Sequence, residues 1–376
     1  MNNFCYNAFL GLDISAAGKI KPCCKFLNEQ IPVFDVKDGI KTYKESLFLS
    51  DLQKEFLENK KPVGCERCFR EEDIGIKSKR QLDYEKYKDA LDSISDLSSS
   101  DFKIVSIAFG NLCNFACRIC NVNSSSKWVS EIYKSDGVKF PVHTWYSDNT
   151  LLDDIYRHTK SALHFDIPGG EPFLLEATEQ FDFLDKFSDS DAKNISIHYT
   201  TNGSTFPKES YLKIWERFKE IDIQISIDDI EKRFEYNRWP GKWNEVYQNI
   251  KRFQLLEKEK SNIRLSVSFT VSAFTILYAD EFYKWCLSEQ LPDPWMGLLN
   301  RPFFYKPSIF KNKAKDYIRN KLNQSEFAEV RNLVNCLKED DSQYFESFLS
   351  EIKKLDSIRN QSFKTTFDEL SNLLDD

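Results

Sequence analysis

The sequence lacks any apolar run long enough to cross a membrane. A spanning helix needs about 18 consecutive apolar residues, and no stretch of the 376 residues approaches that length. The opening residues Met1-Asn-Asn-Phe-Cys5 contain neither a basic segment nor a long apolar core, so we expect no signal peptide. Ten cysteines without an export signal indicate reduced thiols. We therefore expect a cytoplasmic protein with no membrane partner.

An excess of positive charge is also missing. The chain has 52 Lys and Arg against 59 Asp and Glu, which gives a formal net charge of −7. A nucleic-acid surface needs a basic patch that neutralises phosphates, so we expect no nucleic-acid partner. Hydrophobic residues make up 41% of the chain, which allows a sizeable core. The length suits two or three domains of about 150 residues each.

Histidine is scarce, with four residues in the whole chain. His164 and His198 lie in segments that alternate like strands, so we expect them to be wall residues rather than catalytic bases. Cys286 and Cys336 have apolar neighbours and predict core packing.

Three cysteines carry the strongest chemical signal. Cys113, Cys117 and Cys120 follow an apolar run with the spacing C-x3-C-x2-C. This spacing supplies three thiolates on one loop, whereas a structural zinc or an ordinary four-iron cluster takes four protein ligands. One iron of a cluster would therefore stay open to a substrate or cofactor. The alternative is three buried, inert cysteines at the start of a helix.

Four further motifs each follow or end a segment with the pattern of a strand. They are Gly169-Gly170-Glu171-Pro172, Asn202 in Thr201-Asn-Gly203, the pair Ser226 and Asp228, and Arg238 in the segment 236–243. In this order, and together with the three cysteines, the motifs resemble those of the radical S-adenosylmethionine (SAM) superfamily. The resemblance covers about residues 103–300.

The resemblance implies a [4Fe-4S] cluster on Cys113, Cys117 and Cys120, with SAM bound at the open iron. Ile119 stands where the family commonly has an aromatic residue, and it can still pack against adenine. The SAM-binding residues implied are Ile119, Gly169, Gly170, Glu171, Pro172, Asn202, Ser226, Asp228 and Arg238.

A second group of cysteines precedes the first predicted strand of this region. Cys5 and Cys23 frame C-x12-G-x4-C, and Cys65 and Cys68 form a C-x2-C. This pattern resembles the twitch module, a shortened relative of the SPASM domain, here placed before the barrel. The module implies an auxiliary [4Fe-4S] cluster on these four cysteines, with [2Fe-2S] or structural zinc as alternatives. Cys24 is then spare or replaces Cys23.

The coarse organisation is α/β. Strands are predicted near 103–108, 163–168, 195–200, 222–227, 263–270 and 295–299, with helices between them. Alternating strands and helices predict a parallel sheet, and the resemblance implies a partial (β/α)6 barrel with ligands at the C-terminal strand ends. The expected domains are a twitch-like domain (1–92), a serine-rich linker (93–101), the barrel (102–306) and a helical C-terminal extension (307–376).

The resemblance implies a radical SAM enzyme of an oxidoreductase type. It would cleave SAM reductively to a 5′-deoxyadenosyl radical and abstract hydrogen from a substrate, with the auxiliary cluster as electron acceptor. We expect a sugar-like small molecule as substrate, with a ribosomal peptide as the alternative, and flavodoxin or ferredoxin as reductant. A non-catalytic iron–sulfur carrier or scaffold is the alternative of another class.

Overall fold

The computed structural model of the protein describes residues 3–73, 77–97, 100–174 and 176–374. Ser98 and Ser99 of the predicted linker lie outside the described residues. The chain forms two compact units, each built from segments that are separate in sequence. The first unit comprises Met1–Leu112, Val142–Tyr199 and Pro207–Asp222, and the second comprises Cys113–Pro141, Thr200–Phe206 and Ile223–Asp376.

The strands form a mixed sheet in the order β3-β2-β1-β4-β5-β6-β7-β8-β9. The six predicted strands are present as β4 (Ile104–Ile107), β5 (His164–Ile167), β6 (Ser196–Thr201), β7 (Glu220–Ser226), β8 (Ile263–Val271) and β9 (Trp295–Leu298). Parallel pairing joins β4 to β5, β5 to β6 and β8 to β9. The α/β class is therefore correct.

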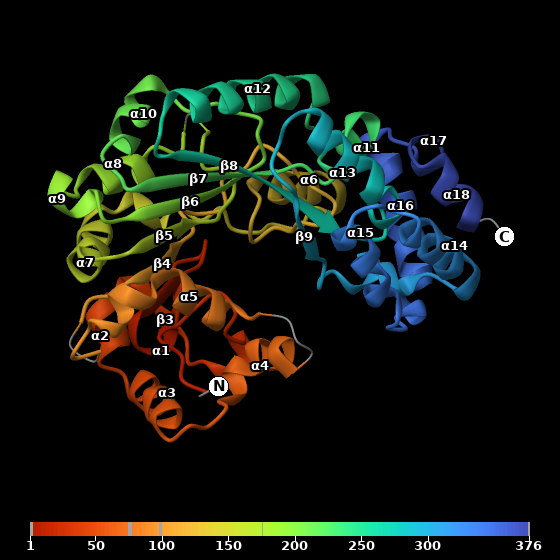
Figure 1. The fold of residues 1–376 in the computed structure, drawn as a ribbon. Coiled ribbons are helices and arrows are strands. Elements are labelled where there is room, and N and C mark those ends of the chain that lie inside the picture. Colours follow the sequence, from red (N-terminus) through yellow and green to blue (C-terminus); the bar gives the residue numbers. More distant parts are fainter. Residues whose placement is uncertain (1–2, 74–76, 98–99, 175, 375–376) are drawn as a thin grey trace. The chain divides into compact units, whose positions relative to one another are not determined.

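The N-terminal region adds three short strands that sequence reasoning missed. They are β1 (Gly11–Ile14), β2 (Lys19–Lys21) and β3 (Phe34–Asp35). β1 pairs in parallel with β4, while β2 pairs antiparallel with both β1 and β3. The sheet is therefore mixed rather than purely parallel, because an N-terminal antiparallel meander extends it (Figure 1).

Some helices of the first unit begin with side-chain caps that the sequence supplies. Ser46 Oγ accepts a hydrogen bond from Leu49 N (3.2 Å) at the start of α3, and Ser78 and Gln81 form a capping box at the start of α5. The helices of this unit are α1 (Asn7–Leu10), α2 (Ile40–Lys44), α3 (Leu47–Leu57), α4 (Glu66–Asp73), α5 (Lys79–Asp92), α7 (Asn149–Thr159), α8 (Glu179–Asp185), α9 (Asp189–Ala192) and α10 (Glu209–Trp215).

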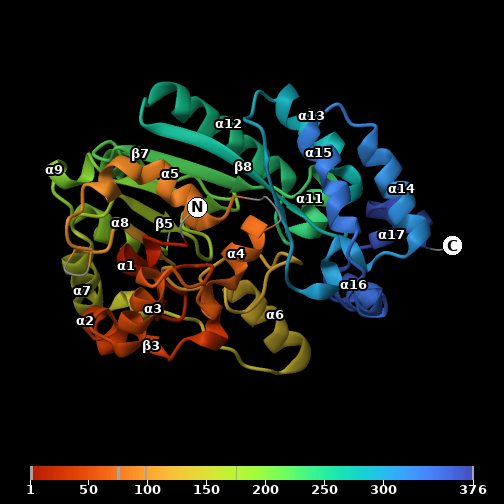
Figure 2. The same cartoon turned by 60° about the horizontal axis from the view of Figure 1, so that its bottom comes forward.

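The second unit is rich in helices, and those of its C-terminal part gather in one group (Figure 2). Their core is aromatic: Phe274, Phe348, Phe363 and Phe367 pack against one another with ring centroids 5.4–6.2 Å apart. The helices are α6 (Ser126–Asp136), α11 (Glu231–Asn237), α12 (Trp243–Glu259), α13 (Ala279–Ser288), α14 (Asn312–Asn323), α15 (Ala328–Asn332), α16 (Phe345–Arg359), α17 (Phe363–Thr366) and α18 (Asp368–Leu374).

None of the helices within the described ranges combines the length and the apolar character that crossing a membrane requires.

Candidate functional site

The three cysteines of the C-x3-C-x2-C motif lie on the loop that leads into α6, and the first turn of that helix holds the loop. Ser125 caps α6 by accepting a hydrogen bond from Trp128 N (3.2 Å), while its own hydroxyl donates to Phe115 O (2.5 Å). Trp128 Nε1 donates to Cys117 O at 2.8 Å. Cys113 N donates to the hydroxyl of Ser126 (3.1 Å). We call residues 113–120 the cysteine loop.

Two residues found by motif, Asn202 and Arg238, contact thiols of the cysteine loop within the second unit. Asn202 Nδ2 lies 3.8 Å from Cys113 Sγ and 3.0 Å from Asn114 Oδ1. Arg238 Nη1 lies 3.8 Å from Cys117 Sγ. Segments that are far apart in sequence therefore converge on the cysteines.

Arg238 also has a carboxylate partner in the same unit. Its Nη2 lies 2.6 Å from Asp228 Oδ2, and both side chains are buried. The other oxygen of Asp228 accepts a hydrogen bond from Thr270 N (2.7 Å). The two residues that the resemblance assigned to SAM binding are thus paired with each other. The guanidinium provides positive charge beside the cysteine loop.

The backbone after β7 is strained where it presents Asp228. Asp228, Asp229 and Glu231 have positive φ angles of 57°, 142° and 50°, which L-residues rarely adopt. Asp229 is fully buried and pairs with Arg233 at 2.8 Å, and burial raises the pKa of its carboxyl to about 7 although Arg233 lowers it. Such strain is common at functional sites.

Burial acts strongly on the thiols of the cysteine loop. Burial raises the pKa of Cys117 to about 12, although the charge of Arg238 opposes the rise. Burial likewise raises the pKa of Cys120. Thiolates in this environment need nearby positive charge, which Arg238 supplies in part and the iron of a bound iron–sulfur cluster would increase.

The Gly-Gly-Glu-Pro motif packs, within the first unit, on the residue that directly precedes Cys113 in the chain. Glu171 N donates to Leu112 O at 2.7 Å. A Cβ added at Gly170 would overlap the Leu112 carbonyl group, whereas one at Gly169 would meet nothing closer than Gly110 O at 3.9 Å. The resemblance implies that Gly170 binds SAM. Independently of any ligand, the Leu112 carbonyl of the same chain requires a glycine at this position.

The remaining predicted SAM-site residues that form side-chain or backbone hydrogen bonds do so with neighbours outside the cysteine loop. Glu171 is buried, and its Oε1 accepts a hydrogen bond from Phe173 N (3.1 Å). Pro172 O accepts a short hydrogen bond from Gln180 Nε2. The hydroxyl of Ser226 accepts one from Ser268 Oγ (3.1 Å), and Ile119 is half-buried.

The four predicted auxiliary ligands line one cavity in the first unit. Cys5 precedes α1 and Cys23 follows β2, while Cys65 and Cys68 lie at the start of α4. The same cavity is lined by Lys25, Lys79 and Arg80, which bring positive charge to the thiols, and by Asn7, Phe26 and Phe56. Four thiols with cationic neighbours match the donor set of either an iron–sulfur cluster or zinc.

Cys24 does not line this cavity, although it is adjacent to Cys23 in sequence. Its side chain is accessible to solvent, yet burial raises the pKa of its thiol to about 11. The charge of Lys79 lowers this pKa, and those of Asp13 and Asp166 raise it. The two adjacent cysteines therefore face different surroundings.

The thiols of the two cysteine groups are not arranged as the ligands of a metal ion. In residues 3–73, 77–97, 100–174 and 176–374, no three Cys, His, Asp or Glu side chains converge tightly enough to hold a metal ion. The chemistry of both donor sets fits iron–sulfur binding, three thiols on the cysteine loop and four around the N-terminal cavity.

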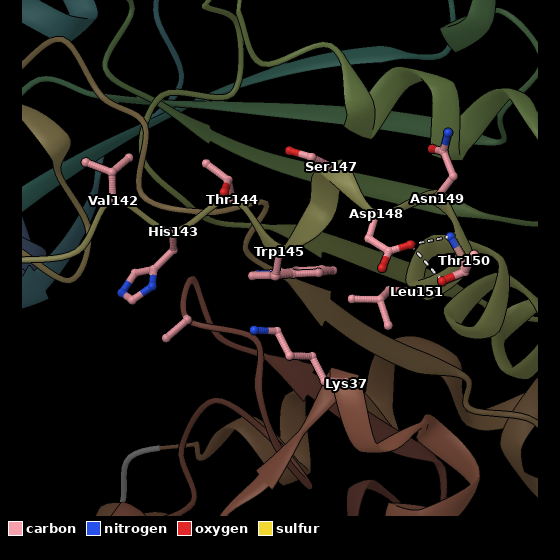
Figure 3. Close-up of a pocket in the computed structure, with 11 residues that line it drawn as sticks. Lys37, Val142, His143, Thr144, Trp145, Ser147, Asp148, Asn149, Thr150 and Leu151 are labelled. Atoms are coloured by element: carbon pink, nitrogen blue, oxygen red, sulfur yellow. Dashed lines mark hydrogen bonds between the residues drawn. The ribbon is translucent and has the colours of Figure 1, made fainter.

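A separate cavity of about 850 Å³ lies in the first unit and contains none of the predicted site residues (Figure 3). Its carboxylate, Asp148, is engaged in capping α7, because Oδ1 accepts hydrogen bonds from Thr150 N (2.9 Å) and Thr150 Oγ1 (2.7 Å). Lys37, His143 and Trp145 also line this cavity, and neither Lys37 nor His143 forms an ion pair with Asp148. The cavity therefore offers no assembled catalytic group.

Two arginines at the cysteine loop were missed by sequence reasoning. Arg359, at the end of α16, donates to Ala116 O (2.9 Å) and pairs with Glu131 (2.8 Å). Arg118, inside the cysteine spacing, pairs with Asp356. The helix α16 thus holds the loop through Asp356 and Arg359. For Arg118 the sequence offered one signal, a charged residue between Cys117 and Cys120.

Comparisons with known proteins give little further information. No family model matches the chain, and no curated protein matches it. Among solved structures, anSMEcpe with bound AdoMet matches at 17% identity over 58% of this chain and 58% of that chain, with a TM-score of 0.41. The complex of anSMEcpe with AdoMet and the Cp18Cys peptide matches at 16% identity over 58% of each chain, with a TM-score of 0.38.

SuiB from Streptococcus suis, bound to S-adenosylmethionine, matches at 14% identity over 83% of this chain and 67% of that chain, with a TM-score of 0.38. The match to anSMEcpe spans 58% of the length of that protein. Likeness at such TM-scores carries no conclusion for this chain.

Proposed function

We propose that the chain is a radical SAM enzyme that binds a [4Fe-4S] cluster through Cys113, Cys117 and Cys120. The observation that supports this proposal is the convergence of independent motifs on the cysteine loop. Asn202 and Arg238 were identified from local sequence alone, 89 and 121 residues beyond their partner cysteines, and each lies 3.8 Å from a thiol. Inert structural cysteines would not require this arrangement.

When bound, the cluster and SAM would supply a 5′-deoxyadenosyl radical able to take hydrogen from carbon. The protein's own part is to bind and orient. Arg238 places positive charge beside Cys117 through Nη1, and Asp228 holds the same guanidinium through Nη2. Ile119, Asn202, Ser226 and the segment Gly169–Pro172 are the further residues proposed to bind SAM.

We also propose that Cys5, Cys23, Cys65 and Cys68 hold an auxiliary iron–sulfur cluster. The common cavity of these four thiols and its cationic lining support the proposal. Such a cluster would accept an electron during substrate oxidation, with flavodoxin or ferredoxin as the external reductant of the first cluster. Structural zinc uses the same thiolates and is the competing assignment.

Two substrate classes belong to the proposal. One is a sugar-like small molecule and the other is a ribosomal peptide. The first experiment does not depend on the substrate. Reconstituted, reduced protein is incubated anaerobically with SAM, and the product is analysed for 5′-deoxyadenosine.

Formation of 5′-deoxyadenosine would support the enzyme. Its absence from a sample with both sites loaded would favour the rival function, a non-catalytic iron–sulfur carrier. A carrier gives no role to the contacts that Asn202 and Arg238 make with the cysteine loop.

A further inference from the structure

A row of polar side chains crosses the parallel part of the sheet within the first unit. Strand register aligns Asp13 of β1 with Ser106 of β4, Ser106 with Asp166 of β5, and Asp166 with His198 of β6. His198 Nδ1 lies 2.7 Å from Asp222 Oδ2 of β7, which extends the row by one strand. We call these five residues the polar row.

Such a row is unusual in this kind of sheet. Parallel strands are normally covered on both faces and carry apolar side chains throughout. The residues that flank the polar row in β5 and β6, Phe165, Ile167, Ile197 and Tyr199, follow this rule and are buried. Side chains aligned across neighbouring strands point to the same face. One face of the sheet therefore carries a continuous polar band that the fold itself does not need.

Charge pairing leaves one carboxylate of this band without a partner. Asp13 lies 3.8 Å from Lys21, and Asp222 pairs with His198. Nearby on α5, Lys79 pairs with Asp83 at 2.8 Å and Lys86 lies 4.0 Å from Glu220. Among the residues that the structure describes, Asp166 has neither an ion pair nor a hydrogen bond to its carboxylate. Burial raises the pKa of this carboxyl, and the charges of His198 and Lys79 lower it.

A second, independent feature lies on the helix α5, close to His164 of β5. Tyr87 of α5 is 8% exposed, and no described group is hydrogen-bonded to its hydroxyl. Its ring lies 5.7 Å from that of His164, which precedes Asp166 by two residues in β5. Burial raises the pKa of Tyr87, and the charges of Asp166 and Asp222 contribute to the rise. A buried hydroxyl without a partner is costly, so this one is suited to a ligand group that binds beside Asp166.

We propose that the polar row binds an ammonium group of the substrate, with Asp166 as its carboxylate partner and Tyr87 as a further hydrogen-bonding group. An ammonium group offers three donors and no acceptor, which matches a free carboxylate beside an unpaired hydroxyl. The ammonium belongs either to an amine-bearing polyol or to a lysine side chain of a peptide. The role of this ligand as substrate rests on the proposed function.

The test uses the reconstituted full-length protein labelled with ¹³C in its histidines. The chain has only four histidines, so the imidazole signal of His198 can be assigned with a His198→Gln variant. Two matched pairs of probes are titrated to millimolar concentration: glucosamine against glucose, and Nα-acetyl-lysine amide against Nα-acetyl-norleucine amide. Within each pair only the first compound carries an ammonium group.

We expect an ammonium probe to shift the His198 signal saturably and its neutral match to leave it unchanged. The pair that responds identifies the source of the ammonium. Asp166→Asn should weaken the response by about tenfold or more, because the charge-assisted hydrogen bond is lost. Asp182→Asn, which removes an exposed carboxylate of α8 in the same unit, should preserve the response. Asp166→Ser repeats the test if the asparagine variant does not fold.

The inference is overturned if neither ammonium probe shifts His198, or if the response is the same in both Asp166 variants as in the wild type. If the wild-type protein forms 5′-deoxyadenosine but responds to neither ammonium probe, the polar-row site is contradicted and the proposed function is not. A wild-type protein that binds a probe and forms no 5′-deoxyadenosine contradicts the proposed function and leaves the binding site standing.

Discussion

Asp356 in α16 lies 2.6 Å from the guanidinium of Arg118, the residue that directly follows Cys117 in the cysteine loop. Arg118 is buried, donates through Nε to Tyr236 O (3.2 Å), and stacks 3.6 Å from the Tyr236 ring. These contacts tie the C-terminal extension to the loop that carries the three cysteines. The extension is therefore part of the support of the candidate site.

Asp356→Asn should lower the free energy of unfolding by about 3 kcal/mol, because it leaves the Arg118 charge buried without its partner. Thermal or denaturant unfolding of the metal-free protein measures the change. Asp136→Asn is the matched control. It breaks an exposed ion pair (3.1 Å) between Asp136 and Lys354, which lies in α16 like Asp356. The control should change stability little, because surface pairs contribute little. Equal effects of the two variants would contradict the account.

Gly170→Ala should destabilise the protein by about 2 kcal/mol, because its new methyl group would overlap the Leu112 carbonyl. Gly169→Ala should be tolerated, since the nearest atom to its methyl group would be 3.9 Å away. Unfolding of both variants without SAM measures the difference. If Gly170→Ala were as stable as Gly169→Ala and only weakened SAM binding, the glycine would serve the ligand and not its own chain.

Adjacent cysteines should behave differently in metal binding. In protein whose cysteine loop carries alanine at all three cysteine positions, we expect about four irons to remain at the N-terminal site. Cys23→Ala in this background should lose that iron, because Cys23 lines the cavity, whereas Cys24→Ala should keep it. Elemental analysis after anaerobic reconstitution gives the result.

Zinc in place of iron at this site would remove the proposed electron acceptor, and with it the support for substrate oxidation. Loss of metal in Cys24→Ala, with metal retained in Cys23→Ala, would reverse the ligand assignment.

His198 should titrate at the highest pH of the four histidines. Burial lowers its pKa, but the hydrogen bond with Asp222 and the charge of Asp166 outweigh burial and raise it. The charges of Lys86 and of His164, if protonated, face the same ring from α5 and β5 and oppose the rise. Burial lowers the pKa values of His143, His158 and His164. Histidine chemical shifts followed against pH measure this order.

Asp222→Asn should lower the pKa of His198. Because the folded-state pKa is raised, the stability that the pair contributes is fully present below the unfolded value of about 6.5 and is lost as pH rises through the folded value. The variant should therefore cost about 1.5 kcal/mol near pH 6 and much less near pH 9. A cost that grew with pH would contradict the assignment.

The sequence predicted the strands well and their arrangement partly. Two patterns marked these strands: an apolar run such as 103–109, where β4 is buried throughout, and an alternation such as that of β7, where every second residue is buried. β2 and β3 were missed because strands of three and two residues carry almost no periodic signal, and β1 was missed although it is as long as β4. The helical nature of the chain beyond Pro307 was also predictable from its amphipathic pattern.

The contacts of the candidate site were less predictable. Motifs indicated Cys117, Asp228 and Arg238, but not that Arg238 would pair with Asp228, because a local pattern holds no information on tertiary partners. The polar row could not be predicted for the same reason. Alternation marked His198 as a wall residue, and only the strand register aligns it with Asp166.

The most direct test of the central claim is the amount of 5′-deoxyadenosine that the reconstituted, reduced protein forms from SAM under anaerobic conditions. We expect product from the wild type and from Cys286→Ala, whose thiol is buried in α13 and belongs to neither cysteine group. We expect none from the variant with alanine at positions 113, 117 and 120. Product from that triple variant, or none from wild-type protein with its iron in place, would contradict the account.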